Sequence, residues 1–292
     1  MDIPWEDVQL FLAVAEAGSL SRAAKALRIG QPTVSRRLAA LEYRLGAQLF
    51  RRSVDGARLT GAGERLVAPA KRMAEWAGEV GRVAESPTQA PRGLVRVTAS
   101  PFVCHDFLAP FSGWLAQKEP GLRLEVLSAM EYLDLARGEA DLALRARPPA
   151  HPDLTLVREV TFGAAAYVSK ALAARLPKKP KLTDLPWLAW APPWDLLPPN
   201  PQLRALMPDH TPSFTSDNFL VQIAAAEAGT GAIVMSLPEH RFARKRDLVP
   251  LPIDLGPYSR STLYLVCAKS ALDIPRVRRV ADLLVAELER AR

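Results

Sequence analysis

The chain has 292 residues, of which 49% are hydrophobic and 24% are charged. These values are ordinary for a folded globular protein, and the length predicts two or three domains. The formal net charge of +7 points to an anionic partner, such as nucleic acid or a membrane surface. No run of 18 apolar residues is present, so no membrane-spanning helix is expected.

The positive charge is concentrated in one short window. Between Arg22 and Arg58, nine Lys and Arg residues stand against two acidic residues, Glu42 and Asp55. The window therefore has a net charge of +7, as large as that of the whole chain. A phosphate-binding surface needs such a concentration, although a run of charge can also be a solvated face.

Residues 1–59 are predicted to form three helices and a short basic wing. The first helix spans residues 5–17. Ser21 is the predicted cap of a second helix, and Pro32 suits the first position of a third helix that Gly46 ends. The apolar residues that recur at helical spacing on the buried face of the third helix are Val34, Leu38, Leu41 and Leu45.

This arrangement predicts a helix-turn-helix whose third helix enters the major groove of double-stranded DNA. The side-chain amide of Gln31 can read adenine, and Arg36 can read guanine through two hydrogen bonds. Cations on the second helix and the wing are expected to bind phosphates. The predicted DNA-binding residues are Ser19, Arg22, Gln31, Pro32, Thr33, Ser35, Arg36, Arg37, Arg51 and Arg52. A helical hairpin with a solvated basic face is the structural alternative.

Residues 60–86 are predicted to form one long linker helix that Thr60 caps. Its apolar residues alternate in spacings of four and three, as in a coiled coil, so a second copy of the helix is expected to cover them. These residues are Leu66, Ala70, Met73, Ala77, Val80 and Ala84. Pro69 is expected to kink the helix. Residues 87–93 contain two prolines and are predicted to be a hinge.

From residue 94 onward, predicted strands and helices alternate, which indicates an α/β architecture. The predicted strands are 94–100, 122–127, 140–146, 231–236 and 262–268, and the predicted helices are 101–118, 131–138, 217–228 and 275–290. They form two blocks, which predict two lobes with a cleft between them. Lobe I covers about 94–160 and 265–292, and lobe II covers about 161–264.

Enzyme signals are poor. The four histidines lie too far apart in sequence for the short spacings of metal ligands, and no Walker A, G-x-G-x-x-G or G-x-S-x-G motif follows a predicted strand. Cys104 and Cys267 lie in apolar surroundings and are expected to be buried free thiols. The N-terminal residues lack the pattern of a secretory signal, so a cytoplasmic protein is expected. Because the motifs of catalysis and metal binding are missing, no enzyme activity, metal or cofactor is expected either.

Residues 2–66 resemble the N-terminal domain of the LysR-type transcriptional regulators. The similarity lies in FLAVAEAGSLSRAAKALRIGQPTVSRRLAALEYRLGAQLFRR, followed by RLTGAGERL. GEADLALRA and AAAEAGTGAIVMSLPEH are similar to segments of the effector domain of that family. The resemblance implies an N-terminal all-α winged helix-turn-helix and a dimerising linker helix. It also implies an α/β effector domain with two lobes, like a periplasmic binding protein.

The resemblance implies that an effector binds between the lobes, near the loop that follows the first strand of lobe I. The free N–H groups of the helix that begins at Pro101 favour a carboxylate, so an organic or aromatic acid is the candidate class. The Pro-rich loop 191–201 departs from the family pattern. The implied effector-binding residues are Ser100, Pro101, Phe102, Ser128, Ala129, Arg145, Arg147, Ser216 and Asp217.

The prediction is therefore a sequence-specific transcriptional regulator that a small-molecule effector modulates. A homodimer through the linker helix, and a homotetramer by resemblance, would bind promoter or operator DNA at half-sites about one helical turn apart. A two-lobed solute-binding or transferase-like protein is the alternative, because fold does not determine function. A nonspecific nucleoid protein is a third reading, which leaves the α/β half unexplained.

Overall fold

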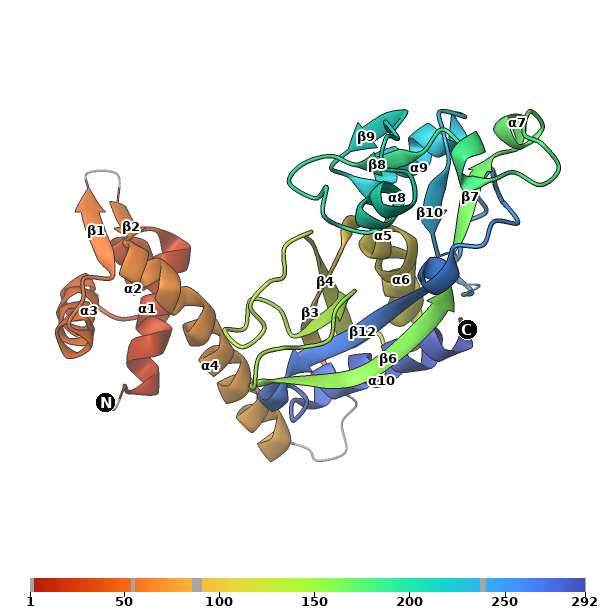
Figure 1. The fold of residues 1–292 in the computed structure, drawn as a ribbon. Coiled ribbons are helices and arrows are strands. Elements are labelled where there is room, and N and C mark those ends of the chain that lie inside the picture. The colour runs from red at the N-terminus through yellow and green to blue at the C-terminus, as the bar shows by residue number, and fades with distance from the viewer. Residues whose placement is uncertain (1–2, 54–55, 86–90, 237–239, 292) are drawn as a thin grey trace. The chain divides into compact units, whose positions relative to one another are not determined.

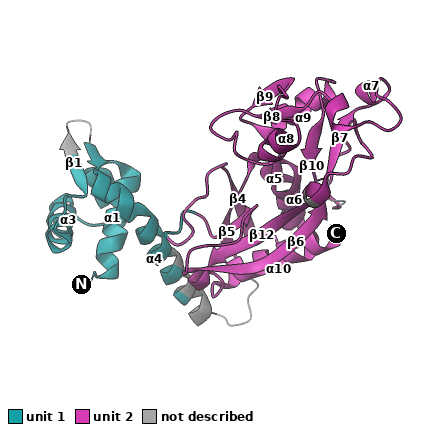
Figure 2. Cartoon of the chain, in the orientation of Figure 1, with its two compact units in different colours: residues 1–90, 137–139 teal, residues 91–136, 140–292 magenta. Residues whose placement is uncertain are grey.

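The computed structural model describes residues 3–53, 56–85, 91–236 and 240–291. The chain divides into two compact units (Figure 2). The first contains residues 1–90 and 137–139, and the second contains residues 91–136 and 140–292. No helix in the described ranges has both the length and the apolar character that crossing a lipid bilayer requires.

The first unit contains the predicted three helices, the wing and the long helix (Figure 1). Its elements are α1 (Trp5–Ala17), α2 (Leu20–Leu27), α3 (Gln31–Leu45), β1 (Phe50–Ser53), β2 (Gly56–Leu59) and α4 (Gly61–Glu85). Strands β1 and β2 pair antiparallel. Gly46 ends α3 in the left-handed conformation, with φ of 65°, as the sequence predicts.

Two predicted helix starts are wrong by one or two residues. Helix α2 begins at Leu20, so its cap is Ser19 and not Ser21. Helix α3 begins at Gln31, which places Pro32 in the second helical position. The first and second positions of a helix both lie in its first turn, where backbone N–H groups have no partner within the helix. A proline is therefore tolerated at either position.

The core of the first unit joins all three short helices to the wing. Phe11 is fully buried, and its ring centroid lies 5.5 Å from that of Phe50 at the start of β1. The carboxylate of Glu42 on α3 accepts hydrogen bonds from the backbone N–H groups of Leu49 (2.7 Å) and Phe50. A side chain of the third helix thus satisfies the two backbone donors where the chain enters the wing.

Helix α4 is uninterrupted from Gly61 to Glu85, although Pro69 lies inside it. The predicted cap is confirmed, since the hydroxyl of Thr60 accepts a hydrogen bond from the backbone N–H of Gly63 at 3.1 Å. Ala70 is buried in the core of this unit, whereas Met73 and Val80 are exposed. Only part of the predicted apolar seam is therefore covered within its own unit. The side chain of Ala84 lies outside the described residues.

Lobe I of the second unit is built on a five-stranded sheet with the order β4-β3-β5-β12-β6 (Figure 1). Strand β3 is parallel to both of its neighbours, and β12 is antiparallel to both of its neighbours. The strands are β3 (Gly93–Ala99), β4 (Leu122–Ser128), β5 (Leu142–Arg145), β6 (Leu154–Gly163) and β12 (Arg260–Ala268). Strand β6 was not among the predicted elements.

The central strand β5 of this sheet is buried on both faces. Leu142 and Leu144 of β5 face the core formed with the helices, which are α6 (Ala109–Lys118) and α10 (Pro275–Arg290), while Ala143 faces a smaller cluster around Leu135. Residues 131–138 form an irregular segment with turns, so the predicted helix there is wrong. Leu135 is buried against β5 and β12, and this packing takes precedence over the weak helical tendency of so short a segment.

The predicted helix over residues 101–118 contains a π-helical turn. It runs through α5 (Pro101–Val103), the π-turn Cys104–Leu108 and α6. Pro110 has no N–H to donate to the carbonyl of residue 106, and the N–H of Ala109 bonds to the carbonyl of Cys104 instead. The proline therefore explains why the helix widens here, and π-turns of this kind are frequent at functional sites.

Lobe II contains two smaller sheets, which a bridge between Trp187 and Ala232 joins. One has the order β10-β7-β11, and β8 and β9 form the other. Its elements are β7 (Ala165–Ser169), α7 (Lys170–Ala173), β8 (Leu188–Trp190), α8 (Asn200–Leu206), β9 (Phe214–Ser216), α9 (Phe219–Glu227), β10 (Ile233–Met235) and β11 (Leu248–Pro250). Strands β6 and β12 connect the two lobes.

The helix of lobe II begins two residues later than the predicted range 217–228. Helix α9 begins at Phe219, and its cap is Asn218, whose side-chain oxygen accepts a hydrogen bond from the N–H of Leu220 at 2.9 Å. Ser216 lies at the end of β9, and its hydroxyl accepts a hydrogen bond from the N–H of Asn218 at 3.1 Å. The serine therefore shapes the turn that precedes the helix.

Candidate DNA-binding and effector-binding sites

Helix α3 has one buried face and one open face. Val34, Leu38 and Leu41 are buried in the core of the first unit. Gln31 and Arg36, which are predicted to read bases, are exposed. Of the other predicted residues in the first half of α3, Pro32 is exposed, and Thr33 and Ser35 are half-buried. The core therefore holds α3 in place while these side chains remain accessible to a ligand.

Arg37 is held by an ion pair within its own unit. Its Nε and Nη2 donate hydrogen bonds to Asp7 of α1 at 3.0 and 2.7 Å, and Arg44 also pairs with Asp7. Asp7 is 5% exposed, so this carboxylate neutralises part of the basic window from inside. Sequence reasoning missed it because Asp7 lies 30 residues away from Arg37.

The wing and α2 add further cations. Arg51 of β1 and Arg58 of β2 lie directly opposite each other in the hairpin, and both are exposed. Arg22 of α2 is exposed, and Ser19 is a half-buried helix cap. Arg52 lies in β1, but its side chain is outside the described residues. Such side chains can bind phosphates on either side of a groove.

In lobe I, the sheet places the ends of β3 and β4 side by side. Ala99 and Ser128 are paired in register, and the N–H of Ala129 donates a hydrogen bond to the carbonyl of Ala99 at 3.0 Å. Ser100 follows as the residue before α5, and Cys104 donates its thiol hydrogen to the carbonyl of Ala99. Four of the implied effector-binding residues thus lie at the same end of the sheet, where β3 and β4 terminate. They are Ser100, Pro101, Ser128 and Ala129.

The two implied arginines differ in environment. Arg147 is exposed, whereas Arg145, at the end of β5, is 9% exposed. The Nη2 of Arg145 donates to the carbonyl of Leu133 at 2.5 Å, and its guanidinium lies 4.7 Å from the ring centroid of Tyr132. Burial lowers the pKa of Arg145. Its Nε is buried without a hydrogen-bond partner, an unsatisfied donor that a ligand or water could satisfy.

Residues of the two lobes meet at α5 and α9. The ring of Phe102 lies 5.3 Å from that of Phe219 in an edge-to-face contact, and Phe219 stacks on Trp190 at 5.6 Å. Ser216 and Asp217 precede Asn218, the cap of α9, and Asp217 is exposed. The implied residues of lobe II therefore lie at the end of α9 that contacts Phe102.

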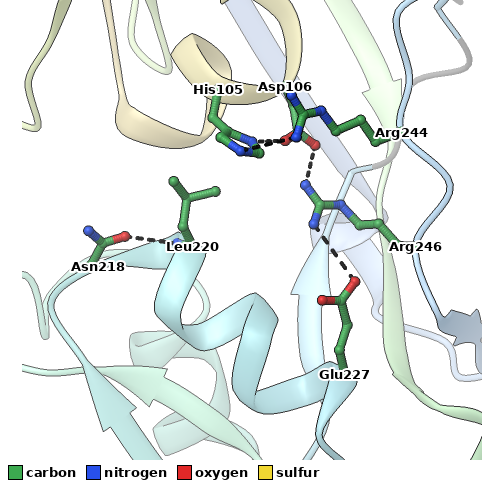
Figure 3. Close-up of polar contacts among 7 residues, drawn as sticks. All are labelled: His105, Asp106, Asn218, Leu220, Glu227, Arg244 and Arg246. Carbon is green, nitrogen blue, oxygen red and sulfur yellow. Dashed lines mark hydrogen bonds and ion pairs between the residues drawn. The ribbon is translucent and has the colours of Figure 1, made fainter.

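An ion-pair cluster also connects the lobes, and sequence reasoning missed it. Asp106 of the π-turn pairs with Arg246, which precedes β11, and the Nη1 of Arg246 lies 3.9 Å from Glu227 of α9 (Figure 3). Asp106 and Arg246 are 140 residues apart, so no local pattern could have revealed the pair. In the described part of the chain, no group of three or more His, Cys, Asp or Glu side chains could hold a metal ion.

Two surface hollows lie elsewhere. One, of about 500 Å³, lies between α1 and α4 of the first unit, where Trp5, Leu12 and Ala74 contribute to its lining. The other, of about 550 Å³, lies along β6 from Leu156 to Thr161. Neither is lined by the implied effector-binding residues, which is consistent with the close contact between Phe102 and Phe219.

Two known protein families together match nearly the whole chain. Residues 5–64 match the bacterial regulatory helix-turn-helix proteins of the lysR family, and residues 88–289 match the LysR substrate binding domain. The Mau operon transcriptional activator of Paracoccus denitrificans is 27% identical over 287 residues, covering 95% of this chain and 94% of that protein. An HTH-type transcriptional regulator of Xanthomonas campestris is 34% identical over 171 residues, which are 56% of this chain and 49% of the relative.

Solved structures of similar fold include full-length OxyR from Pseudomonas aeruginosa, with a TM-score of 0.68, 20% identity and coverage of 99% of this chain and 95% of that chain. Full-length CbnR in complex with its target DNA has a TM-score of 0.58, with 21% identity and coverage of 95% and 99%. These likenesses support the N-terminal winged helix-turn-helix and the two-lobed α/β domain. The family matches support a transcriptional regulator over the alternative of a solute-binding or transferase-like protein. The chain belongs to the LysR family of DNA-binding transcriptional regulators, which carry an effector-binding domain.

Proposed function

We propose that α3 reads base edges in the major groove, and that the cations of α2 and the wing bind the flanking phosphates. The observation that carries this proposal is the two-faced burial of α3, with Gln31 and Arg36 exposed opposite a fully packed core. A rigid helix with a polar open face fits the major groove of B-form DNA. The protein would act on promoter or operator DNA in the cytoplasm, without an enzyme activity of its own.

The Arg36→Ala variant should lose sequence preference. If Arg36 contacts a guanine with two hydrogen bonds, its removal costs about 1–3 kcal/mol of binding to the preferred site and relaxes specificity at one base pair. Gel-shift titrations against the DNA upstream of its own gene, with single base changes, would measure this. Arg175→Ala removes an exposed cation from lobe II and serves as the charge-matched control. Equal weakening on all sequences would instead make Arg36 a phosphate contact.

We propose that α4 forms the dimer interface. Its exposed apolar side chains Met73, Trp76 and Val80 lie on the half of the helix beyond Ala70, where its own unit leaves them uncovered. A coiled-coil-like seam of this kind is stable only when a second helix covers it. Dimers would place two copies of α3 about one helical turn of DNA apart, and the α/β domains would pair these dimers into a homotetramer.

We also propose that a small organic or aromatic acid binds between the lobes, close to Ser100 and Ser128. The edge formed by the ends of β3 and β4 lies beside the first turn of the helix that Ser100 precedes, and N–H groups of such a turn favour an anion. Arg145 and Arg147 can supply a counter-charge, and the buried, unpartnered Nε of Arg145 supports this role. Binding would shift the population of lobe arrangements and thereby the geometry of the dimers on DNA.

The Ser100→Leu variant tests this site. We expect it to lose the thermal shift that small carboxylates and aromatic acids induce in the wild-type protein, because the leucine side chain fills the space beside Ser128 and removes a hydroxyl. DNA binding should remain, since Ser100 lies outside the first unit. A Ser100→Leu variant with a normal ligand response would show that the pocket lies elsewhere.

A further inference from the structure

The helix that begins lobe I presents two side chains to lobe II. Phe102 and Asp106 lie four residues apart, so they point from one side of the α5 and π-turn segment. Phe102 belongs to lobe I by sequence, yet it packs against the lobe II core around Leu188 and Ile223. Asp106 is 7% exposed.

Lobe II supplies the partners of both side chains. Arg246 is paired with Asp106 and lies 3.9 Å from Glu227 through its Nη1 (Figure 3). Its side chain is 11% exposed, so water does little to screen the pair. The guanidinium of Arg246 also lies 5.7 Å from the ring centroid of Phe102, whose edge-to-face partner is Phe219.

The surrounding groups add to this arrangement rather than compete with it. His105 is hydrogen-bonded to Asp106 at 2.7 Å through its Nδ1, and Arg244 approaches the other ring nitrogen at 3.4 Å. The segment that carries Arg246 is itself anchored, because Phe242 packs against the lobe I core. Each lobe therefore packs a partly buried aromatic ring against the core of the other, with the Asp106–Arg246 ion pair nearby.

We propose that Phe102, Asp106, Phe219, Glu227 and Arg246 form an interlobe lock that holds the two lobes closed without a ligand. The lock connects segments of both lobes through charges in a poorly hydrated environment and through the Phe102–Phe219 ring contact, and opening of the lobes would separate Phe102 from Phe219 and Arg246 from one of its two carboxylates. A ligand shifts a conformational equilibrium only by the difference in its affinity for the two states. An effector that opens the lobes must therefore overcome the lock, and one that binds the closed form is assisted by it.

Spin labels on opposite lobes of the full-length protein test the lock directly. Gln117→Cys in lobe I and Lys178→Cys in lobe II provide exposed attachment points. Burial raises the pKa of the native thiols, that of Cys267 to about 11, so they react slowly with the label. The distance distribution between the labels, measured by pulsed electron resonance, should be narrow in the otherwise unchanged protein.

Asp106→Asn and Arg246→Met should each shift this distribution to longer distances and broaden it. The double variant should show a smaller shift than the sum of the two single variants, because Asp106 and Arg246 share one ion pair. Phe102→Leu removes the ring that contacts Phe219, so it should also open the lobes, and it keeps an apolar side chain at this half-buried position. This variant keeps the test valid if a variant in the ion pair does not fold. Lys170→Met is the matched control, since it breaks the exposed pair with Asp247 inside lobe II and should leave the distances unchanged.

Unchanged distances in Asp106→Asn and Arg246→Met would overturn the proposal. A shift in only one of these two variants would also contradict it, because the ion pair requires both partners. No effector is needed for this measurement, so its outcome is independent of the effector site proposed at Ser100.

Discussion

Phe11→Ala is expected to unfold the DNA-binding unit and to abolish DNA binding while the effector domain stays folded. Phe11 is fully buried and contacts Phe50 at the start of the wing. Truncation of a buried phenylalanine to alanine costs about 3–5 kcal/mol, because burial is lost and a cavity remains. A unit of this size has only a small core, so a loss of that magnitude takes most of its stability.

Differential scanning calorimetry of the full-length protein separates the two units if each one unfolds cooperatively. Phe11→Ala should shift or remove the transition of the first unit alone, and gel-shift binding should disappear with it. Tyr43→Ala, at a position on α3 that is 89% exposed, is the aromatic control and should leave both transitions in place. If Phe11→Ala still bound its operator with normal affinity, the three-helix scaffold could not be what presents α3 to DNA.

Local patterns in the sequence predict the regular elements of the fold well. The bounds of α1 and α10 agree with the predicted ranges 5–17 and 275–290, because both helices carry a long apolar stripe and clear end signals. The wing and the long helix α4 also follow from local signals, namely the cap at Thr60 and the glycine at the end of α3. Such features depend on residues within one or two helical turns.

The errors arise where distant residues decide the structure. Residues 131–138 have a helical pattern but form a loop, because Leu135 packs against β5 and β12. The polar residues of β6 have no clear alternation, and the strand exists because it pairs along all of β12, about a hundred residues away. The start of α9 was placed two residues too early because Ser216, Asp217 and Asn218 are all residue types that suit a helix cap, and only the course of β9 selects Asn218.

The candidate sites show the same division. The family resemblance places Ser100 and Ser128 by motif, and the parallel register of β3 and β4 brings them together. The ion pairs that hold the sites could not be predicted in this way. Asp7 meets Arg37 across 30 residues and Asp106 meets Arg246 across 140, and only the fold decides which opposite charges come together.

Arg241→Met should destabilise the effector domain more than any exposed ion pair does. Glu287 of α10 is 2% exposed, and the Nε of Arg241 donates to it at 2.7 Å. Removal of one partner from a buried pair leaves a charge without compensation and costs roughly 3–5 kcal/mol. We expect the lower end of that range, because Arg290 still donates to Glu287 at 2.9 Å and Arg241 is itself partly exposed.

The decisive comparison is with the double variant Arg241→Met/Glu287→Leu, which removes the carboxylate together with its partner. Apolar replacement of a whole buried pair is often neutral or stabilising, so the double variant should regain most of the lost stability. Arg158→Met breaks the exposed pair with Glu289 on the same helix and should change the effector-domain transition by less than about 1 kcal/mol. If Arg241→Met and Arg158→Met had equal effects in calorimetry, water would have to reach Glu287, and the packing of α10 against the lobe I sheet would be looser than the burial of its side chains indicates.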